Sequence, residues 1–235
     1  MCSWAGRFAD DGAPYTDRVL PDGCIDIVWD GERVFVAGPD TRPVPLVADP
    51  GAFFAGIRFR PGLAPTVLGV AACELLDRRV PASALLGNRS DHLAERLHEA
   101  SSLRAAALGL ERALLAWLPA AVPPDRLVEA AVAALGAPSP ASPVAALAQR
   151  LGISERQLNR RMTSAVGYGP KTLHRVLRFR RFLALATQAP ELGLAQLALR
   201  AGYADQAHLC RDSRKLAGVA PTALTPGRPS SVFRA

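Results

Sequence analysis

Two segments of similar design carry the side chains of this chain that are best suited to specific recognition. Residues 144–166 and 194–216 each contain a short apolar stretch, a glycine, and a second stretch rich in arginine and other polar residues. A short helix, a turn and a second, polar helix together form a helix-turn-helix unit. Arginine and asparagine side chains can pair with guanine and adenine edges in the major groove. The two segments therefore predict sequence-specific binding to double-stranded DNA.

The first segment has the local signals that such a unit requires. Gly152 can adopt the left-handed conformation of the turn. Ser154 and Gln157 have the spacing of a capping box, so the second helix is expected to begin there and to run to Val166. A solvated surface helix would show the same polar face, so this segment alone leaves the two interpretations open. The side chains expected to read bases are Arg156, Asn159 and Arg160.

The second segment repeats the pattern, which favours DNA binding. Gly202 would form the turn and Asp205 would cap the second helix. The side chains placed to read bases are Gln206, Ala207, Cys210 and Arg211. Pro170 opens a connecting helix of about 17 residues, or roughly 25 Å, which could hold the two recognition helices about one DNA turn apart. Expected contacts to the DNA backbone come from Ser154, Lys171, Arg178, Arg181, His208 and Arg214.

The charge of the chain is divided unequally. Residues 141–235 hold 15 basic and 4 acidic residues, a net charge of +11, within a chain of net charge +7. Residues 1–140 are therefore acidic, with a net charge of −4. A basic part joined to an acidic part is typical of a polyanion-binding module attached to a different kind of domain.

Several other classes of protein are disfavoured. No stretch of about 18 apolar residues could span a membrane, and the N-terminus does not resemble a secretory signal, so we expect a cytoplasmic protein, nucleoid-associated when bound to DNA. The four cysteines have no CxxC spacing, and we expect them to be reduced. No glycine-rich phosphate loop is present. We therefore expect no enzyme activity, no cofactor and no metal.

Composition predicts an α+β chain with an all-α domain at its C-terminal end. We expect a β-rich N-terminal sensor or dimerisation domain over residues 1–125, a linker region over 126–143 and a DNA-binding domain over 144–228. Within the first domain, strands are expected at about 15–60 and helices at about 63–118. The clearest strand candidates are residues 24–29, 33–37 and 53–59.

The C-terminal part resembles the DNA-binding domain of AraC/XylS-family transcription regulators. The similarity covers residues 141–225 and rests on LAQRLGISERQLNRRM, GYGPKTLHRVLRFRRFLALA and LALRAGYADQAHLCRDSRKLAGVAPTAL. The family implies two helix-turn-helix units joined by a long helix. Ser213 stands where the family usually has a packed phenylalanine, Asp212 adds a negative charge to the same helix, and Leu224 replaces an aromatic residue. These departures predict a second reader that is looser, less basic and less selective than the first.

The N-terminal part is similar to an uncharacterised β-rich domain that often precedes such DNA-binding domains. The similarity rests on PDGCIDIVWD, VFVAGPDTRPVPL, GIRFRPGLAP and ELLDRRVPASALLG. AraC-type regulators commonly carry a cupin-like barrel at this place, which serves effector binding or dimerisation. The resemblance thus makes a small-molecule effector, a homodimer and a contact with RNA polymerase candidates for partners.

Three residues are candidates for contact with an effector. Arg58 and Arg60 flank Phe59 on a predicted strand, so both would point to one side and could meet an anion. Pairing with aspartate or glutamate is the favoured interpretation for both arginines. Trp29 is a third candidate, although packing in the core is the more common role of such a tryptophan.

An enzymatic or thiol-reactive N-terminal domain is the alternative function. Cys24, Asp26 and His92 have the residue types of a nucleophilic triad, but no motif fixes their geometry. A metal or thiol sensor could also use Cys2, Cys24 or Cys73. A strongly lowered cysteine pKa would favour this alternative.

Overall fold

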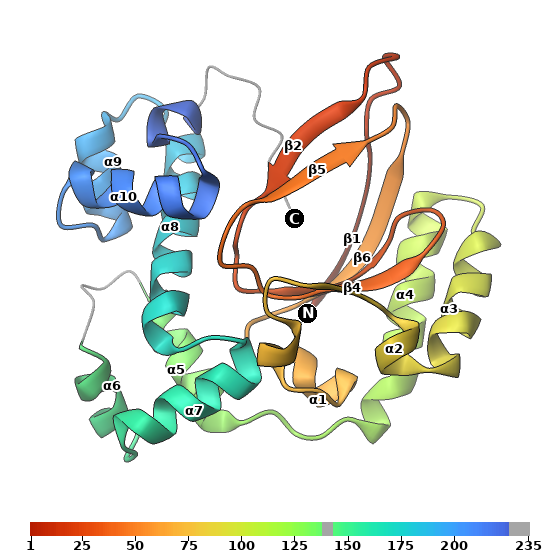
Figure 1. Ribbon diagram of the computed structural model, residues 1–235, viewed down its shortest axis with the longest axis horizontal. Coiled ribbons are helices and arrows are strands. Elements are labelled where there is room, and N and C mark those ends of the chain that lie inside the picture. Colours follow the sequence, from red (N-terminus) through yellow and green to blue (C-terminus); the bar gives the residue numbers. More distant parts are fainter. Residues whose placement is uncertain (138–142, 226–235) are drawn as a thin grey trace.

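The computed structural model describes residues 1–137 and 143–225, in which a β-rich N-terminal part lies beside a helical C-terminal part (Figure 1). Two antiparallel sheets form the first part. A five-stranded sheet has the order β1-β6-β3-β4-β7: Cys2–Arg7, Phe53–Phe59, Ile25–Trp29, Val34–Ala37 and Arg79–Pro81. The strands β2 (Tyr15–Val19) and β5 (Val44–Ala48) pair separately, as a two-stranded unit called here the β2–β5 ribbon. The cupin-like form of this domain stays a prediction.

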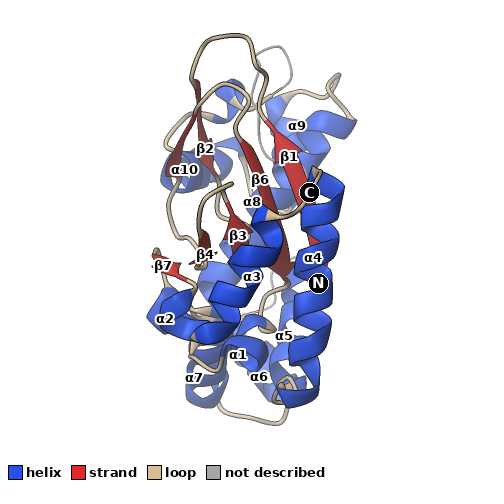
Figure 2. Ribbon diagram, turned by 90° about the vertical axis from the view of Figure 1, so that its right-hand side faces the viewer, coloured by secondary structure: helices blue, strands red, loops and turns tan. Residues whose placement is uncertain are grey.

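One face of the large sheet packs against helices. Alternate residues of the central strands, among them Ile25, Ile27 and Ile57, point to this face and are at most 4% exposed. Figure 2 shows α3 and α4 over the sheet, and their buried leucines complete this core. The helical elements of this part are α1 (Ala64–Leu68), η1 (Ala72–Leu75), α2 (Ser83–Leu86), α3 (Asn88–His98), α4 (Leu103–Trp117) and η2 (Leu118–Ala120).

The three clearest strand candidates are confirmed as β3, β4 and β6, with ends shifted by at most one residue. The strand β1 lies outside the region where strands were expected, because it begins at Cys2 rather than near residue 15. It forms an edge of the sheet and pairs with β6 along its whole length.

The C-terminal part is built around one long helix, α8 (Pro170–Gln188), as Figure 1 shows. Phe179 and Phe182 of this helix are fully buried, in one core with residues from both helix-turn-helix units. None of the described helices is both long and apolar enough to cross a membrane. The other elements are α5 (Arg126–Gly136), α6 (Val144–Arg150), α7 (Glu155–Val166), α9 (Leu194–Ala201), α10 (Gln206–Ala217) and η3 (Pro221–Ala223).

Helix α5 occupies most of residues 126–143, the region expected to be a linker. Asp125 caps this helix by accepting hydrogen bonds from the backbone of Leu127 and Val128. Its residues Val128, Ala131 and Leu135 are buried in the C-terminal core. The helix therefore belongs to the C-terminal domain, because its apolar face has its packing partners there. Residues 138–142 of the expected linker and 226–228 of the expected DNA-binding domain lie outside the described residues.

The two parts of the chain are packed together. Leu20, which follows β2, is 4% exposed and lies in the core of the C-terminal domain. Leu76, from the N-terminal part, packs against the same core. Arg18 donates a hydrogen bond to the carbonyl oxygen of Ala217, at the end of α10 (2.9 Å). The β2–β5 ribbon thus contacts the domain that carries the recognition helices.

This contact predicts that unfolding of the two parts is coupled. Leu20→Ala should lower the free energy of unfolding by about 2–4 kcal/mol, because it leaves a cavity between the parts. Urea titrations followed by circular dichroism and tryptophan fluorescence would measure the loss. Val47→Ala, at a ribbon position that is 67% exposed, is the matched control. An effect of Leu20→Ala no larger than that of Val47→Ala would contradict the coupling.

Candidate nucleic-acid interface

The first helix-turn-helix unit consists of α6 and α7. Gly152 has a positive φ of 69°, as its turn position requires. The Ser154 hydroxyl accepts a hydrogen bond from the Gln157 backbone amide (3.2 Å), and the Gln157 side chain accepts one from the Ser154 amide (2.9 Å). This reciprocal pair confirms the predicted capping box and fixes the start of α7.

The recognition helix α7 divides cleanly into two faces. Leu158, Met162 and Val166 are at most 1% exposed and anchor the helix to the core. The predicted base readers Arg156, Asn159 and Arg160 are exposed on the other face. The guanidinium groups of both arginines have no ion-pair partner among the residues that the structure describes. Such unpaired donors are available to base edges or phosphates.

The second unit, α9 and α10, repeats this arrangement. Gly202 has a φ of 93°, and Asp205 caps α10 by accepting a hydrogen bond from the His208 amide (2.6 Å). Leu209 and Leu216 anchor the helix inside the core. Of the predicted readers, Gln206, Ala207 and Arg211 are exposed, and Cys210 is half-buried.

Asp212 and Ser213 do not face the groove side of α10. Asp212 is 7% exposed, and its carboxylate pairs with Arg178 (2.7 Å) and Arg175 (3.4 Å) of α8. Ser213 is fully buried and donates a hydrogen bond to the Val219 carbonyl oxygen (2.7 Å). The negative charge of Asp212 is therefore balanced inside the domain, which removes the reason to expect a less basic second reader.

Arg178, one of the expected contacts to the DNA backbone, is buried inside the domain. It is 8% exposed, and its guanidinium lies over the Tyr203 ring at 4.3 Å from the ring centre. One of its nitrogens also contacts His208 Nε2 at 2.9 Å. Because a guanidinium can only donate, His208 accepts here and is neutral. Burial and the charge of Arg178 lower the pKa of His208, which favours the neutral imidazole.

Arg181 likewise connects helices within the domain. Its guanidinium donates to the carbonyl oxygens of Ala201 (3.1 Å), Gly136 (2.8 Å) and Ala137 (2.9 Å). These atoms lie at the ends of α9 and α5, where backbone carbonyls lack helical partners. Its N–H groups thus donate to carbonyl oxygens at helix ends, and this does not fit the expected contact with a phosphate. The remaining expected backbone contacts, Ser154, Lys171 and Arg214, are exposed.

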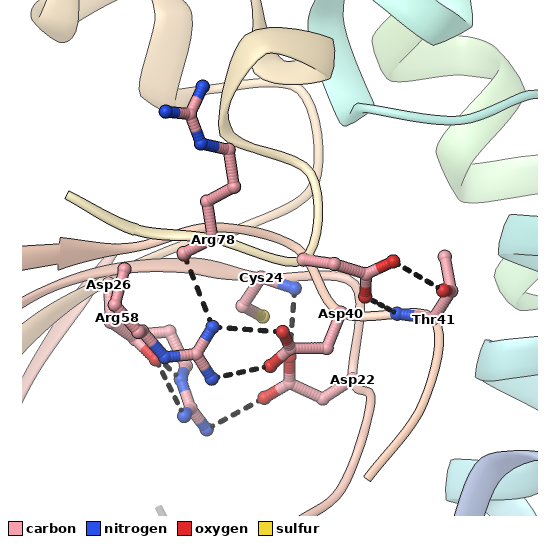
Figure 3. A network of polar contacts seen from close by, with 9 residues as sticks. Asp22, Cys24, Asp26, Asp40, Thr41, Arg58 and Arg78 are labelled. Carbon is pink, nitrogen blue, oxygen red and sulfur yellow. Dashed lines mark hydrogen bonds and ion pairs between the residues drawn. The ribbon is translucent and has the colours of Figure 1, made fainter. Parts of the chain in front are cut away.

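The three candidate effector residues have different surroundings. Trp29 is 3% exposed and packs against Phe53 on the helix-covered face of the sheet, so it belongs to the core. Arg58 binds Asp26 through two hydrogen bonds (3.0 and 2.9 Å) and Asp22 at 3.1 Å, which confirms the favoured pairing for this residue (Figure 3). Arg60 is exposed beyond the end of β6.

The geometry does not favour a reactive thiol. Burial, together with the neighbouring Asp22, raises the pKa of the Cys24 thiol, whereas a nucleophile requires a lowered pKa. His92 Nδ1 contacts the Asn88 carbonyl oxygen of its own helix. Among the residues that the structure describes, no three metal-ligating side chains are grouped together.

A cavity of about 350 Å³, not expected from the sequence, lies between the β2–β5 ribbon and the large sheet. Its walls are apolar, and Asp26, Arg58 and Arg79 lie at one side. Val28 of β3 could have indicated this cavity. It alternates with core residues and so lies on the other face of the sheet, yet it is apolar and only 6% exposed. An apolar residue on the second face of a strand indicates that another layer covers that face.

The buried ion pair of Arg178 yields a prediction about stability. Arg178→Ala should lower the free energy of unfolding by about 3 kcal/mol, because Asp212 would stay buried with only the longer contact to Arg175. Thermal or urea unfolding would measure this, with Arg200→Ala on the exposed face of α9 as the control, expected within about 0.5 kcal/mol of the parent protein. Unchanged stability together with weaker DNA binding would instead support the phosphate contact.

Comparisons with known proteins agree with this arrangement. Residues 147–225 match a family described as a helix-turn-helix domain, and residues 1–81 match a domain of unknown function, DUF6597. A search of curated proteins found no match.

Three solved structures are similar to the chain or to part of it. ToxT from Vibrio cholerae is similar in fold, with 10% identity, 96% of this chain and 98% of that chain covered, and a TM-score of 0.50. The C-terminal domain of AraT, a response regulator from Geobacillus stearothermophilus, has 22% identity, coverage of 47% and 93%, and a TM-score of 0.42. The DNA-binding domain of AdpA, a global transcriptional factor solved with a target DNA, has 26% identity, coverage of 42% and 88%, and a TM-score of 0.39. This chain thus carries an AraC-type helix-turn-helix DNA-binding domain in its C-terminal part and a DUF6597 domain in its N-terminal part.

Proposed function

We propose that this protein is a transcription regulator of the AraC family that reads two adjacent major grooves on one side of a DNA duplex, with α7 in one groove and α10 in the next. The observation that carries the proposal is that both recognition helices expose a polar face while their apolar faces are anchored in one core with α8. With 19 residues, α8 is about 28 Å long, which is comparable to the pitch of DNA. One protomer can then place two helices one turn apart.

Base reading would be divided between the two helices. Arg156, Asn159 and Arg160 are the candidates on α7. Arg160 has an exposed guanidinium that forms no ion pair with the described residues and is therefore suited to a guanine contact. On α10, Arg211 has the equivalent properties, and Gln206 can pair with adenine. Ala207 and Cys210 are small side chains that fit apolar contact with a thymine methyl group.

Contacts to phosphates would come from fewer residues than the sequence suggested. Ser154 lies at the start of α7, where the helix N-terminus favours a phosphate. Lys171 lies in the first turn of α8 and Arg214 in the last turn of α10, and both cations are exposed. These three contacts would set the position of the protein on the duplex.

The N-terminal domain is proposed to bind an effector. The support is the cavity between the β2–β5 ribbon and the large sheet, together with the contact of this ribbon with α10. Association into a homodimer and a contact with RNA polymerase remain predictions from the family resemblance.

Selection on randomised duplex DNA tests the two-groove proposal. The parent protein should enrich two sequence blocks with centres about one helical turn apart. Arg160→Ala should cost about 1–3 kcal/mol on that site and relax one position in one block, whereas Arg211→Ala should relax a position in the other block. Arg104→Ala, on an exposed position of α4, is the control. A single enriched block, or equal weakening on all sequences, would overturn the assignment.

Salt dependence tests the proposed phosphate contacts. Lys171→Ala and Arg214→Ala should each weaken binding to all sequences alike and reduce the slope of log K against log salt by about one. Fluorescence anisotropy at several salt concentrations would give the slopes. Arg178→Ala and Arg181→Ala should leave the slope unchanged wherever the protein remains folded. A reduced slope in the Arg178 or Arg181 variant would show that these side chains do reach phosphates.

A further inference from the structure

The loop between β4 and β5, residues 38–43, touches both recognition helices and is called here the bridging loop. Pro39 lies at the end of α7, where a β-carbon on Gly167 would be 2.5 Å from the proline Cγ. Pro43 lies at the end of α10, where a β-carbon on Gly218 would be 3.6 Å from the proline Cγ. Figure 1 shows that α7 and α10 both end toward the N-terminal part. The loop therefore bridges the C-terminal ends of the two recognition helices.

The two contact points are aligned with the proposed base readers. Gly167 directly follows α7 and comes seven residues after Arg160. Gly218 directly follows α10 and comes seven residues after Arg211. Seven residues make about two helical turns, so positions at this spacing share one face of a helix. DNA that covers both reading faces would therefore come close to the bridging loop.

The length of the loop matches a place between the two readers. The five residues from Pro39 to Pro43 span at most about 14 Å. Between two adjacent major grooves on one side of a duplex lies a minor groove, which is bordered by the two sugar-phosphate strands. In the proposed two-groove complex, the bridging loop lies opposite this intervening segment of DNA.

Contacts within the N-terminal domain hold the bridging loop in shape. Asp77 accepts hydrogen bonds from the amide and the hydroxyl of Thr41, both of 2.7 Å, which Figure 3 marks with dashed lines. The Asp77 amide donates to the Pro39 carbonyl oxygen (3.1 Å). Asp77 itself has a φ of 55°, a strained conformation that persists only where the surrounding contacts fix it. The loop is thus preorganised.

Arg42 is the basic side chain of this loop. It is exposed, and its guanidinium forms no ion pair with the residues that the structure describes. The adjacent carboxylate of Asp40 is 7% exposed and already bound to Arg79 through two hydrogen bonds (2.9 and 2.8 Å). Because the backbone of the loop is fixed, a contact of Arg42 with a phosphate would cost mainly the freedom of one side chain.

We propose that Arg42 binds the phosphates of the DNA segment between the two major grooves, so that the N-terminal domain forms part of the DNA interface. This proposal rests on the proposed two-groove function. Since phosphates carry no base sequence, the N-terminal domain contributes affinity and register through this contact, while α7 and α10 supply the base readout.

Substitutions of Arg42 test the contact in the full-length protein. Fluorescence anisotropy would measure binding to the selected two-block duplex at several salt concentrations. Arg42→Ala should weaken binding about three- to tenfold and reduce the slope of log K against log salt by about one. Arg42→Lys, which keeps the charge, should retain the slope. Affinity and slope of Arg42→Ala equal to those of the parent protein would overturn the proposal.

The matched control is Arg89→Ala, at an exposed position of α3, on the helix-covered side of the large sheet. This variant should bind DNA with the affinity and the salt slope of the parent protein. Circular dichroism would establish that all variants are folded.

Neutral phosphates locate the contact on the duplex. Uncharged methylphosphonates would replace the phosphates between the two blocks. The parent protein should lose about the same factor in affinity as Arg42→Ala loses on normal DNA, and Arg42→Ala should lose less than about twofold further. Methylphosphonates at the outer ends of the duplex should weaken both proteins equally. Equal losses by both proteins on the duplex with neutral phosphates between the blocks would overturn the proposed position of Arg42.

The base composition between the two blocks distinguishes phosphates from the minor groove. A contact with phosphates predicts the same effect of Arg42→Ala on A·T-rich and G·C-rich intervening sequences. An effect confined to A·T-rich sequences would place Arg42 in the minor groove and overturn the phosphate contact. Failure of the two-groove function would appear as a single enriched block in the selection. Failure of this inference alone would leave two blocks that Arg42→Ala binds like the parent protein.

Discussion

The proposed reading of two neighbouring turns of DNA by two short helices requires a rigid body that holds them at a fixed separation. In this chain α8 is that body, because Phe179 and Phe182 lie in one core with both helix-turn-helix units. Polar contacts add to this packing: Arg178 joins α8 to α10, and Arg181 joins it to the ends of α5 and α9. The orientation of both readers depends on this central helix.

The arginines of the C-terminal domain fall into two groups. Some arginines are buried or half-buried and serve the fold, as Arg178 does with Asp212. Others, such as Arg160 and Arg211, are exposed on the recognition helices. Net charge alone overstates the charge that is available to DNA, since buried and exposed arginines contribute equally to the sum.

Local signals allowed much of the fold to be predicted. The glycine turns, the Ser154 cap and the apolar faces of α7 and α10 depend on residues within one or two helical turns, which a sequence displays directly. The packing of α5 in the C-terminal core and the pairing of Arg178 with Asp212 depend on contacts between distant segments. The periodicity of the sequence carries no information about such contacts. The cavity was missed for the same reason, since β2 and β5 pair across two intervening strands.

The central claim, that two readers are held at a fixed separation, is tested most directly by the spacing of their DNA sites. Affinity would be measured on duplexes that carry both selected blocks, with base pairs inserted between them. An insertion of about five base pairs turns the second groove to the opposite side, and affinity should fall to that of one block alone. A further insertion to a full extra turn should not restore it, because α8 cannot lengthen. Affinity that is independent of spacing would contradict a rigid two-groove reader.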